Sequence, residues 1–181
     1  MCCKDPAEFT YVALPDRGRV EFDIDHKSPM FEFQTGFSPF GAFRLPVMTE
    51  PYLIEIRSYL RGGPDPGRAQ VLYPVAAFLS EDYLVMRSVG LEAVVPELPL
   101  QERAGAPAYR LAVPVDPARG HERYVVVFTP YELVAPGREP ELPSTLELAE
   151  AAAREAFLGA SPEGHLSITI VTAHGNAKPA R

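Results

Sequence analysis

Short runs with β-strand patterning recur along this chain, and most of them end at a proline. Residues 20–25 alternate cleanly: Val20, Phe22 and Ile24 share one face, and three carboxylates share the other. Because the side chains of a strand alternate between its two faces, this pattern predicts a half-buried strand. Residues 124–129 are the clearest run, with Tyr-Val-Val-Val-Phe-Thr, and they predict a buried central strand.

Further strands are predicted at residues 42–45, 52–60, 71–79, 83–89, 109–115 and 165–171. Pro74 lies inside one of these runs, so we expect a bulge or two short pieces there. A turn at residues 80–82 joins two of the runs into a predicted hairpin. Residues 31–46 contain five of the ten phenylalanines but are broken by glycine and proline. They predict a strand or bend and a turn before the strand at 42–45.

One helix is predicted near the C-terminus, at about residues 145–158. Ser144 and Glu147 have the spacing of a capping box, good helix formers follow, and Gly159 ends the run. Many short strands with regular turn signals indicate a mainly β protein: an antiparallel β-sandwich, jelly-roll or Ig-like, with one α-helix. We expect an irregular N-terminal lead-in at residues 1–19, a sandwich domain at 20–172 and a flexible tail at 173–181.

The composition narrows the classes of partner. The 181 residues are 46% hydrophobic and 23% charged, which suits one folded domain. The net charge of −7, without a block of basic residues, argues against a nucleic-acid or anionic membrane surface. No apolar run approaches the roughly 20 residues of a transmembrane helix. The 20 prolines mostly separate the apolar runs, as expected at strand ends and edges.

The two cysteines are adjacent, Cys2 and Cys3. A disulfide between neighbours closes a small strained ring, so we do not expect one as a structural staple. The chain start resembles a protein whose signal peptide has been removed, with Met1 added, and a cysteine there would suit a lipid anchor. The alternative is a pair of exposed free thiols without a role.

No motif predicts catalysis, a cofactor or a metal site. The four histidines, His26, His121, His165 and His174, are widely spaced, which favours scattered turn and strand-end positions over metal ligands. Glu21, Asp23 and Asp25 on one strand face could bind a cation or act as acid and base, but a solvated outer face explains them equally well. We therefore expect a protein that is not an enzyme.

Aromatic residues are the most suggestive candidates for ligand contact, because exposed rings can stack on the apolar faces of sugars. Phe31, Phe33 and Phe43 are expected in the core. Phe37 and Phe40 lie beside turn residues and are the better exposed candidates. Tyr59, Tyr73, Tyr109 and Tyr131 are undecided between core and surface, and we take Tyr109 with Phe37 and Phe40 as the predicted ligand-binding set.

Five segments of the chain share their order with a known family: residues 42–46, 53–56, 71–82, 124–129 and 164–170. In this order they resemble the maltose operon periplasmic protein family. The resemblance covers most of the chain and implies an exported, periplasmic protein associated with maltose and maltodextrin uptake. The family supplies no catalytic residues to carry over. This chain departs from it in starting with paired cysteines and in lacking a long C-terminal extension.

Two functions follow as hypotheses. The first is a non-enzymatic accessory protein that binds maltodextrin or another oligosaccharide, or assists its transport proteins; the second is an envelope module that binds protein partners and no sugar. An exposed aromatic surface rimmed by polar side chains would favour the first, and a flat apolar patch the second. A glycoside hydrolase would need two carboxylates facing each other across a cleft, and no pattern in the sequence predicts such a pair.

Overall fold

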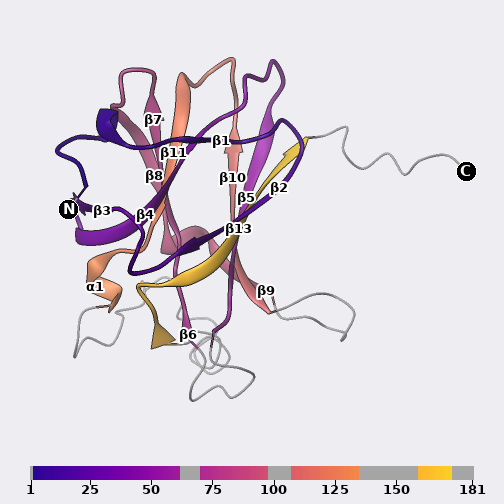
Figure 1. The fold of residues 1–181 in the computed structure, drawn as a ribbon. Coiled ribbons are helices and arrows are strands. Elements are labelled where there is room, and N and C mark those ends of the chain that lie inside the picture. Colours follow the sequence, from indigo (N-terminus) through magenta and orange to yellow (C-terminus); the bar gives the residue numbers. More distant parts are fainter. Residues whose placement is uncertain (1, 62–69, 98–106, 135–158, 173–181) are drawn as a thin grey trace, which may run out of the picture.

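The protein is described from a computed structural model, in which residues 2–61, 70–97, 107–134 and 159–172 are defined. Two β-sheets dominate it, one on the left and one on the right of Figure 1. The first sheet has the order β1 (Val12–Ala13), β4 (Gly36–Arg44), β11 (Glu122–Phe128), β7 (Val75–Ser80), β8 (Val85–Val89), with β3 (Met30–Phe33) also paired to β4. The second has the order β2 (Gly18–Ile24), β13 (Gly164–Thr172), β5 (Tyr52–Tyr59), β10 (Ala108–Val115), β9 (Val94–Glu97).

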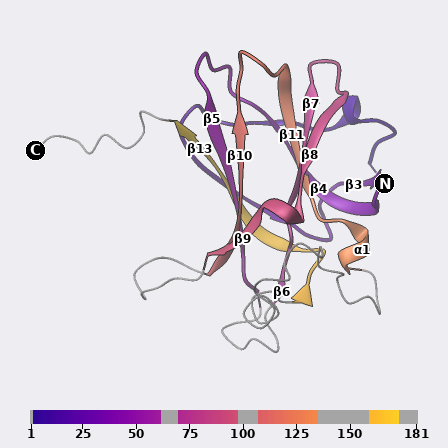
Figure 2. The ribbon, with the colours of Figure 1, turned by 180° about the vertical axis from the view of Figure 1, so that it is seen from behind.

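Smaller elements complete the described part of the chain. The strands β6 (Gln70–Val71) and β12 (Gly159–Ala160) pair with each other at one end of the molecule, as the reverse view in Figure 2 also shows. The short helices are η1 (Pro6–Glu8), η2 (Leu91–Ala93) and α1 (Tyr131–Val134). The prediction of a mainly β, antiparallel protein with sandwich-like packing is confirmed. Its pairings within the described residues are antiparallel except β1 with β4 and β12 with β6.

The main core lies between the two sheets. Ile54 and Ile56 of β5 face Val125 and Val127 of β11, and all four side chains are fully buried. In both strands these residues alternate with residues that point away from the main core, as the sequence pattern predicts. Burying one such side chain stabilises the fold by about 1.5–3 kcal/mol.

A second core covers the outer face of the first sheet. Val126 and Phe128 point to this side of β11, where they pack with Phe40 and Phe9. The ring of Phe9 lies 4.3 Å from that of Phe40. β11 is therefore buried on both faces, as its unbroken apolar run predicts. The lead-in that we expected to be irregular is ordered here, since it includes η1 and β1 and lays Phe9 across the sheet.

Each predicted strand has a counterpart in the structure, but β1, β9 and β12 were not predicted, and β8 begins at Val85 and not at residue 83. The run at residues 71–79 forms two pieces, β6 and β7, on either side of Pro74, and β7 and β8 form the predicted hairpin. Residues 31–46 differ, because β3 and β4 make a hairpin in which β4 continues through Pro39 and Gly41. Gly36, with φ of +101°, turns the chain into β4.

Gly41 lies within β4 because the space beside it is occupied. A Cβ atom there would stand 3.1 Å from both the Phe22 and the Phe43 rings. The glycine thus allows close ring packing, and it marks no turn. The predicted helix at 145–158 and tail at 173–181 lie outside the described residues. Among the described helices, none has the length and apolar character needed to cross a membrane.

Candidate functional site

Three tyrosines from distant parts of the chain meet on the outer side of the first sheet. In this tyrosine cluster (Tyr11, Tyr83 and Tyr124) the ring of Tyr124 lies 4.3 Å from Tyr11 and 4.9 Å from Tyr83. Tyr11 and Tyr83 are 5.8 Å apart at an interplanar angle of 28°. The Tyr124 ring therefore packs against both of the other rings.

Each tyrosine is positioned by a different element. Tyr124 projects from β11 on the same face as Val126 and Phe128. Tyr11 precedes β1 in the lead-in, and its hydroxyl donates a hydrogen bond of 2.9 Å to the Pro6 carbonyl. Tyr83 lies in the turn between β7 and β8 with φ of +62°, a left-handed conformation that non-glycine residues rarely adopt.

The hydroxyl groups give the tyrosine cluster a polar edge. The Tyr124 hydroxyl donates to that of Tyr83 over 3.5 Å, and this bond is the main reason why the pKa of Tyr124 is raised. Burial raises the pKa of Tyr11. The Tyr11 and Tyr124 phenols therefore remain neutral over the physiological range and can donate and accept hydrogen bonds.

Charged side chains surround the tyrosine cluster. Arg44 is the cross-strand partner of Tyr124 on β4, and Glu81 in the β7–β8 turn also acts on Tyr124 electrostatically. Asp5 does the same at Tyr11. All three charged residues are exposed. Half-buried aromatic rings bordered by neutral hydroxyls and charged groups are chemically suited to a sugar, which offers apolar ring faces and many hydroxyls.

The predicted ligand-binding set does not form a site. Phe37 is 40% exposed, but Phe40 and Tyr109 are each 2% exposed and offer no ring face to a ligand. Phe40 is buried because it lies on the outer face of the first sheet, which the lead-in covers. Tyr109 shares a face of β10 with Leu111 and Val113, and it packs edge-on against Tyr73 in the main core, 5.3 Å away.

The other aromatic candidates divide between core and surface. Phe43 lies in the main core, while Phe31 and Phe33 pack against the second core. Tyr131 is 48% exposed on α1. Tyr59 lies on the outer face of the second sheet, but the Arg19 guanidinium stands 5.4 Å from its ring centre and the His165 ring 5.5 Å. Neighbouring side chains therefore already occupy the surroundings of the Tyr59 ring.

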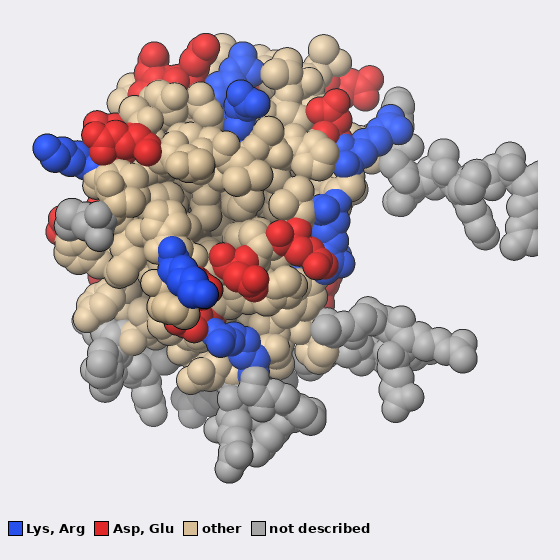
Figure 3. Space-filling view, viewed as in Figure 1, with Lys and Arg blue, Asp and Glu red and all other residues tan. Residues whose placement is uncertain are grey.

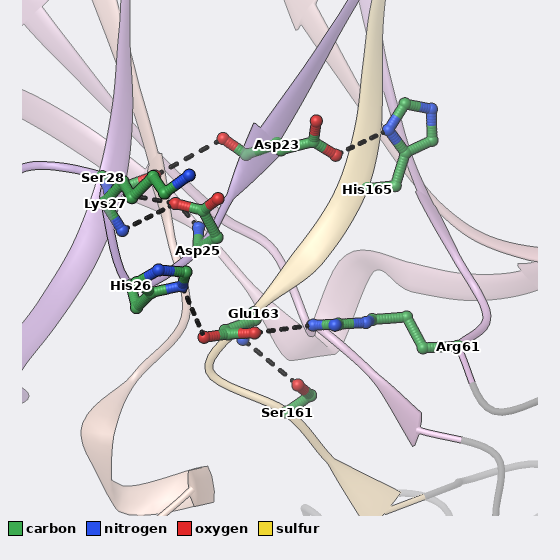
Figure 4. A network of polar contacts seen from close by, with 9 residues as sticks. All are labelled: Asp23, Asp25, His26, Lys27, Ser28, Arg61, Ser161, Glu163 and His165. Atoms are coloured by element: carbon green, nitrogen blue, oxygen red, sulfur yellow. Dashed lines mark hydrogen bonds and ion pairs between the residues drawn. The ribbon is translucent and has the colours of Figure 1, made fainter.

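A polar network at the edge and end of the second sheet contains Asp23 of β2, Asp25 directly after it, Glu163 and two histidines (Figure 4). His165 Nδ1 lies 2.8 Å from Asp23, and Arg61 forms a 3.0 Å ion pair with Glu163, whose other oxygen is 3.9 Å from His26.

Asp25 accepts from the Lys27 and Ser28 backbone N–H groups, and the Lys27 bond is the main cause of its lowered pKa. No group of three or more His, Cys, Asp or Glu side chains in the described ranges is arranged to hold a metal ion. His174 lies outside these ranges.

A group of four paired charges lies on the second sheet. Glu55 and Glu97 each contact both Arg57 and Arg110 on the outer face of the second sheet, at 2.8–3.6 Å. On the face shown in Figure 3, acidic and basic side chains are interspersed, with no large area of one sign. This face therefore offers no continuous basic surface for a polyanion such as nucleic acid.

An open hollow of about 470 Å³ lies near the β10–β11 turn, lined by residues that include Pro51, Arg87 and Glu122. The Arg87 guanidinium bonds to Glu122 at 2.6 Å and to the Pro114 carbonyl at 2.7 Å. Its centre lies 4.5 Å from the middle of the Phe78 ring. Through these contacts Arg87 of β8 connects β11 of the first sheet with β10 of the second.

The state of the two cysteines differs from the sequence-based expectation, which did not include a disulfide between them as a structural staple. A disulfide joins Cys2 to Cys3. The bond can form because the two side chains meet across a single peptide link, and it connects no distant parts of the chain. In this oxidised pair neither sulfur is a thiol, so attachment of a lipid at Cys2 or Cys3 requires the bond to be absent.

In comparisons with protein-family models, curated proteins and solved structures, none matched this chain. The family resemblance noted in the sequence thus stays an expectation. The tyrosine cluster is the feature that sequence reasoning missed. One signal was present: Tyr83 follows Ser80-Glu81-Asp82 at a turn position where glycine or asparagine is usual.

Proposed function

We propose that this protein is a non-enzymatic accessory protein of carbohydrate uptake in the periplasm, which binds maltodextrin or a related oligosaccharide at the tyrosine cluster. The observation that carries the proposal is the contact of Tyr11, Tyr83 and Tyr124 beside the exposed charges of Arg44 and Glu81. The order of the five sequence segments supports the choice of sugar and of compartment.

The backbone of Tyr83 adds support to this choice of site. A left-handed conformation in a bulky residue costs about 1–3 kcal/mol, and such strain concentrates at functional positions. Here it places a ring against Tyr11 and Tyr124 in a turn where glycine would be easier. Stacking between rings offsets part of the cost.

The test is a calorimetric titration with maltose through maltoheptaose. We expect saturable binding that strengthens with chain length, and a loss of about tenfold in affinity for Tyr83→Ala, the equivalent of one aromatic contact. Tyr131→Ala removes another exposed tyrosine, outside the cluster, and should leave the affinity unchanged. Absence of binding at millimolar sugar would exclude direct binding.

A second candidate, an envelope module that binds a protein partner, is favoured by one observation. Leu84, Val85 and Met86 are 66%, 62% and 51% exposed, and they follow one another into the edge strand β8. Exposed apolar residues on a sheet edge are typical of strands that accept a partner strand. This candidate predicts pull-down of an envelope protein that Leu84→Lys with Met86→Lys abolishes, without any sugar binding.

A further inference from the structure

The disulfide between Cys2 and Cys3 calls for an explanation other than stability. Disulfides stabilise folded proteins mainly by restricting the unfolded chain, and this effect grows with the length of the loop that they close. The Cys2–Cys3 bond joins neighbours in sequence and closes no such loop. Its contribution to the free energy of folding by this route is therefore minimal.

The position of the pair links it to the second core. Cys2 is exposed, whereas Cys3 is partly buried against the second core, the same cluster that Phe9 and Tyr11 pack on. The Cys2 backbone N–H donates to the Met30 carbonyl on β3 at 3.1 Å, and the Lys4 N–H donates to the Glu8 carboxylate at 2.9 Å. The pair thus forms part of the contact between the lead-in and the first sheet.

We propose that Cys2–Cys3 is a thiol–disulfide exchange site, with a low-molecular-weight thiol as its co-reactant, and that its redox state controls how residues 2–11 dock on the first sheet. A thiolate attacks the sulfur of Cys2, the exposed residue of the pair, and forms a mixed disulfide. The Cys2–Cys3 bond breaks, and the Cys3 sulfur leaves as a thiolate that takes a proton.

A second thiolate then attacks the sulfur of the bound thiol. This step releases the oxidised dimer of the co-reactant and leaves Cys2 as a thiol. The sum is two thiols oxidised to one disulfide, while the protein disulfide gains two electrons and two protons. The reverse reaction uses the oxidised form of the same co-reactant.

The bond closes a small ring that fixes the side chains of Cys2 and Cys3 relative to their peptide link. Once it opens, both side chains rotate independently and Cys3 is no longer held against the second core. The lead-in that carries Phe9 and Tyr11 loses one of its contacts. We expect its aromatic residues to become less ordered in the reduced protein.

The experiment equilibrates the full chain in glutathione buffers of varied ratio, counts alkylated thiols by mass spectrometry and records the near-ultraviolet circular dichroism of the tyrosines. We expect two thiols to appear together, in parallel with a reduced tyrosine signal. The double variant Cys2→Ser with Cys3→Ser is the matched control and should give the weaker signal in every buffer.

Two results would overturn the proposal. In one, the two cysteines stay as thiols in oxidised glutathione, or yield only mixed or intermolecular disulfides. In the other, the bond forms and breaks but the tyrosine signal is the same in both states. Neither result depends on whether the protein binds a sugar.

Discussion

The ring of Tyr83 lies 4.9 Å from the ring of Tyr124 and within 17° of parallel to it, although the Tyr83 backbone adopts a left-handed φ of +62°. The two residues come from the β7–β8 turn and from β11, 41 positions apart in sequence. The contact between them therefore stabilises a turn that the backbone alone would disfavour.

Two substitutions of Tyr83 distinguish the free-energy cost of its backbone conformation from the stabilisation by its ring contacts. Tyr83→Ala keeps the unfavourable φ and loses the ring, so we expect about 1–3 kcal/mol of destabilisation in urea unfolding. Tyr83→Gly also loses the ring but accepts this φ freely, and it should be about 1 kcal/mol more stable than the alanine variant. Equal stability of the two variants would show that the backbone conformation costs little.

The ion pair between Arg87 and Glu122 should contribute to stability, since the Glu122 side chain is 8% exposed. Glu122→Gln leaves the guanidinium with the Pro114 carbonyl and the Phe78 ring, and we expect a loss of about 1–3 kcal/mol. Arg119→Met is the control, because its pair with Asp116 involves a side chain that is 89% exposed. That change should stay within about 0.5 kcal/mol.

Glu55 and Glu97 should depend on each other energetically, because they share two arginines. Each single change to Gln is expected to cost about 1 kcal/mol or less. Since both carboxylates contact Arg57 and Arg110, a double-mutant cycle should give a coupling of about 0.5 kcal/mol or more. High salt should reduce these effects, and strictly additive changes would show that the arginines bind each carboxylate independently.

Alkaline pH should destabilise the fold through Tyr52. Burial, with a contribution from the Glu122 charge, raises the pKa of this phenol to about 12, against about 10 in an unfolded chain. Between these values the folded state keeps a proton that the unfolded state has released, so stability falls as pH rises.

Tyr52→Phe should therefore lose less stability than the unmodified protein over this pH range, as measured by urea unfolding. Tyr131→Phe, at an exposed position on α1, is the matched control. An identical pH dependence for all three proteins would contradict a buried, protonated Tyr52.

The sheets were predictable because their signal is local. Alternation in residues 20–25 and 52–56, and prolines such as Pro74 at the breaks, depend only on near neighbours in the chain. The same logic would have placed Tyr109 in the core, since it shares a face with Leu111 and Val113.

This local pattern could not predict whether the outer face of the first sheet is exposed or covered. Pro39 and Gly41 resemble turn residues, so Phe40 was expected at the surface. In the structure they lie within β4, and the lead-in with Phe9 covers Phe40. A strand pattern indicates which side chains share a face, but it does not indicate which distant segment covers that face.

The tyrosine cluster was missed for the same reason. Tyr11, Tyr83 and Tyr124 lie in three separate segments, and their proximity depends on the docking of the lead-in beside the β7–β8 turn. No spacing in the sequence reports such a contact. The one local signal, a tyrosine at a turn position where glycine or asparagine is usual, does not indicate which rings Tyr83 contacts.

The measurement that tests the central claim most directly is an NMR titration of the aromatic ring signals with maltoheptaose. The account predicts saturable shifts of the Tyr83 and Tyr124 rings, with the Tyr131 ring unaffected. Saturable shifts confined to Phe37 or to other surfaces, or no shift at millimolar sugar, would contradict oligosaccharide binding at the tyrosine cluster.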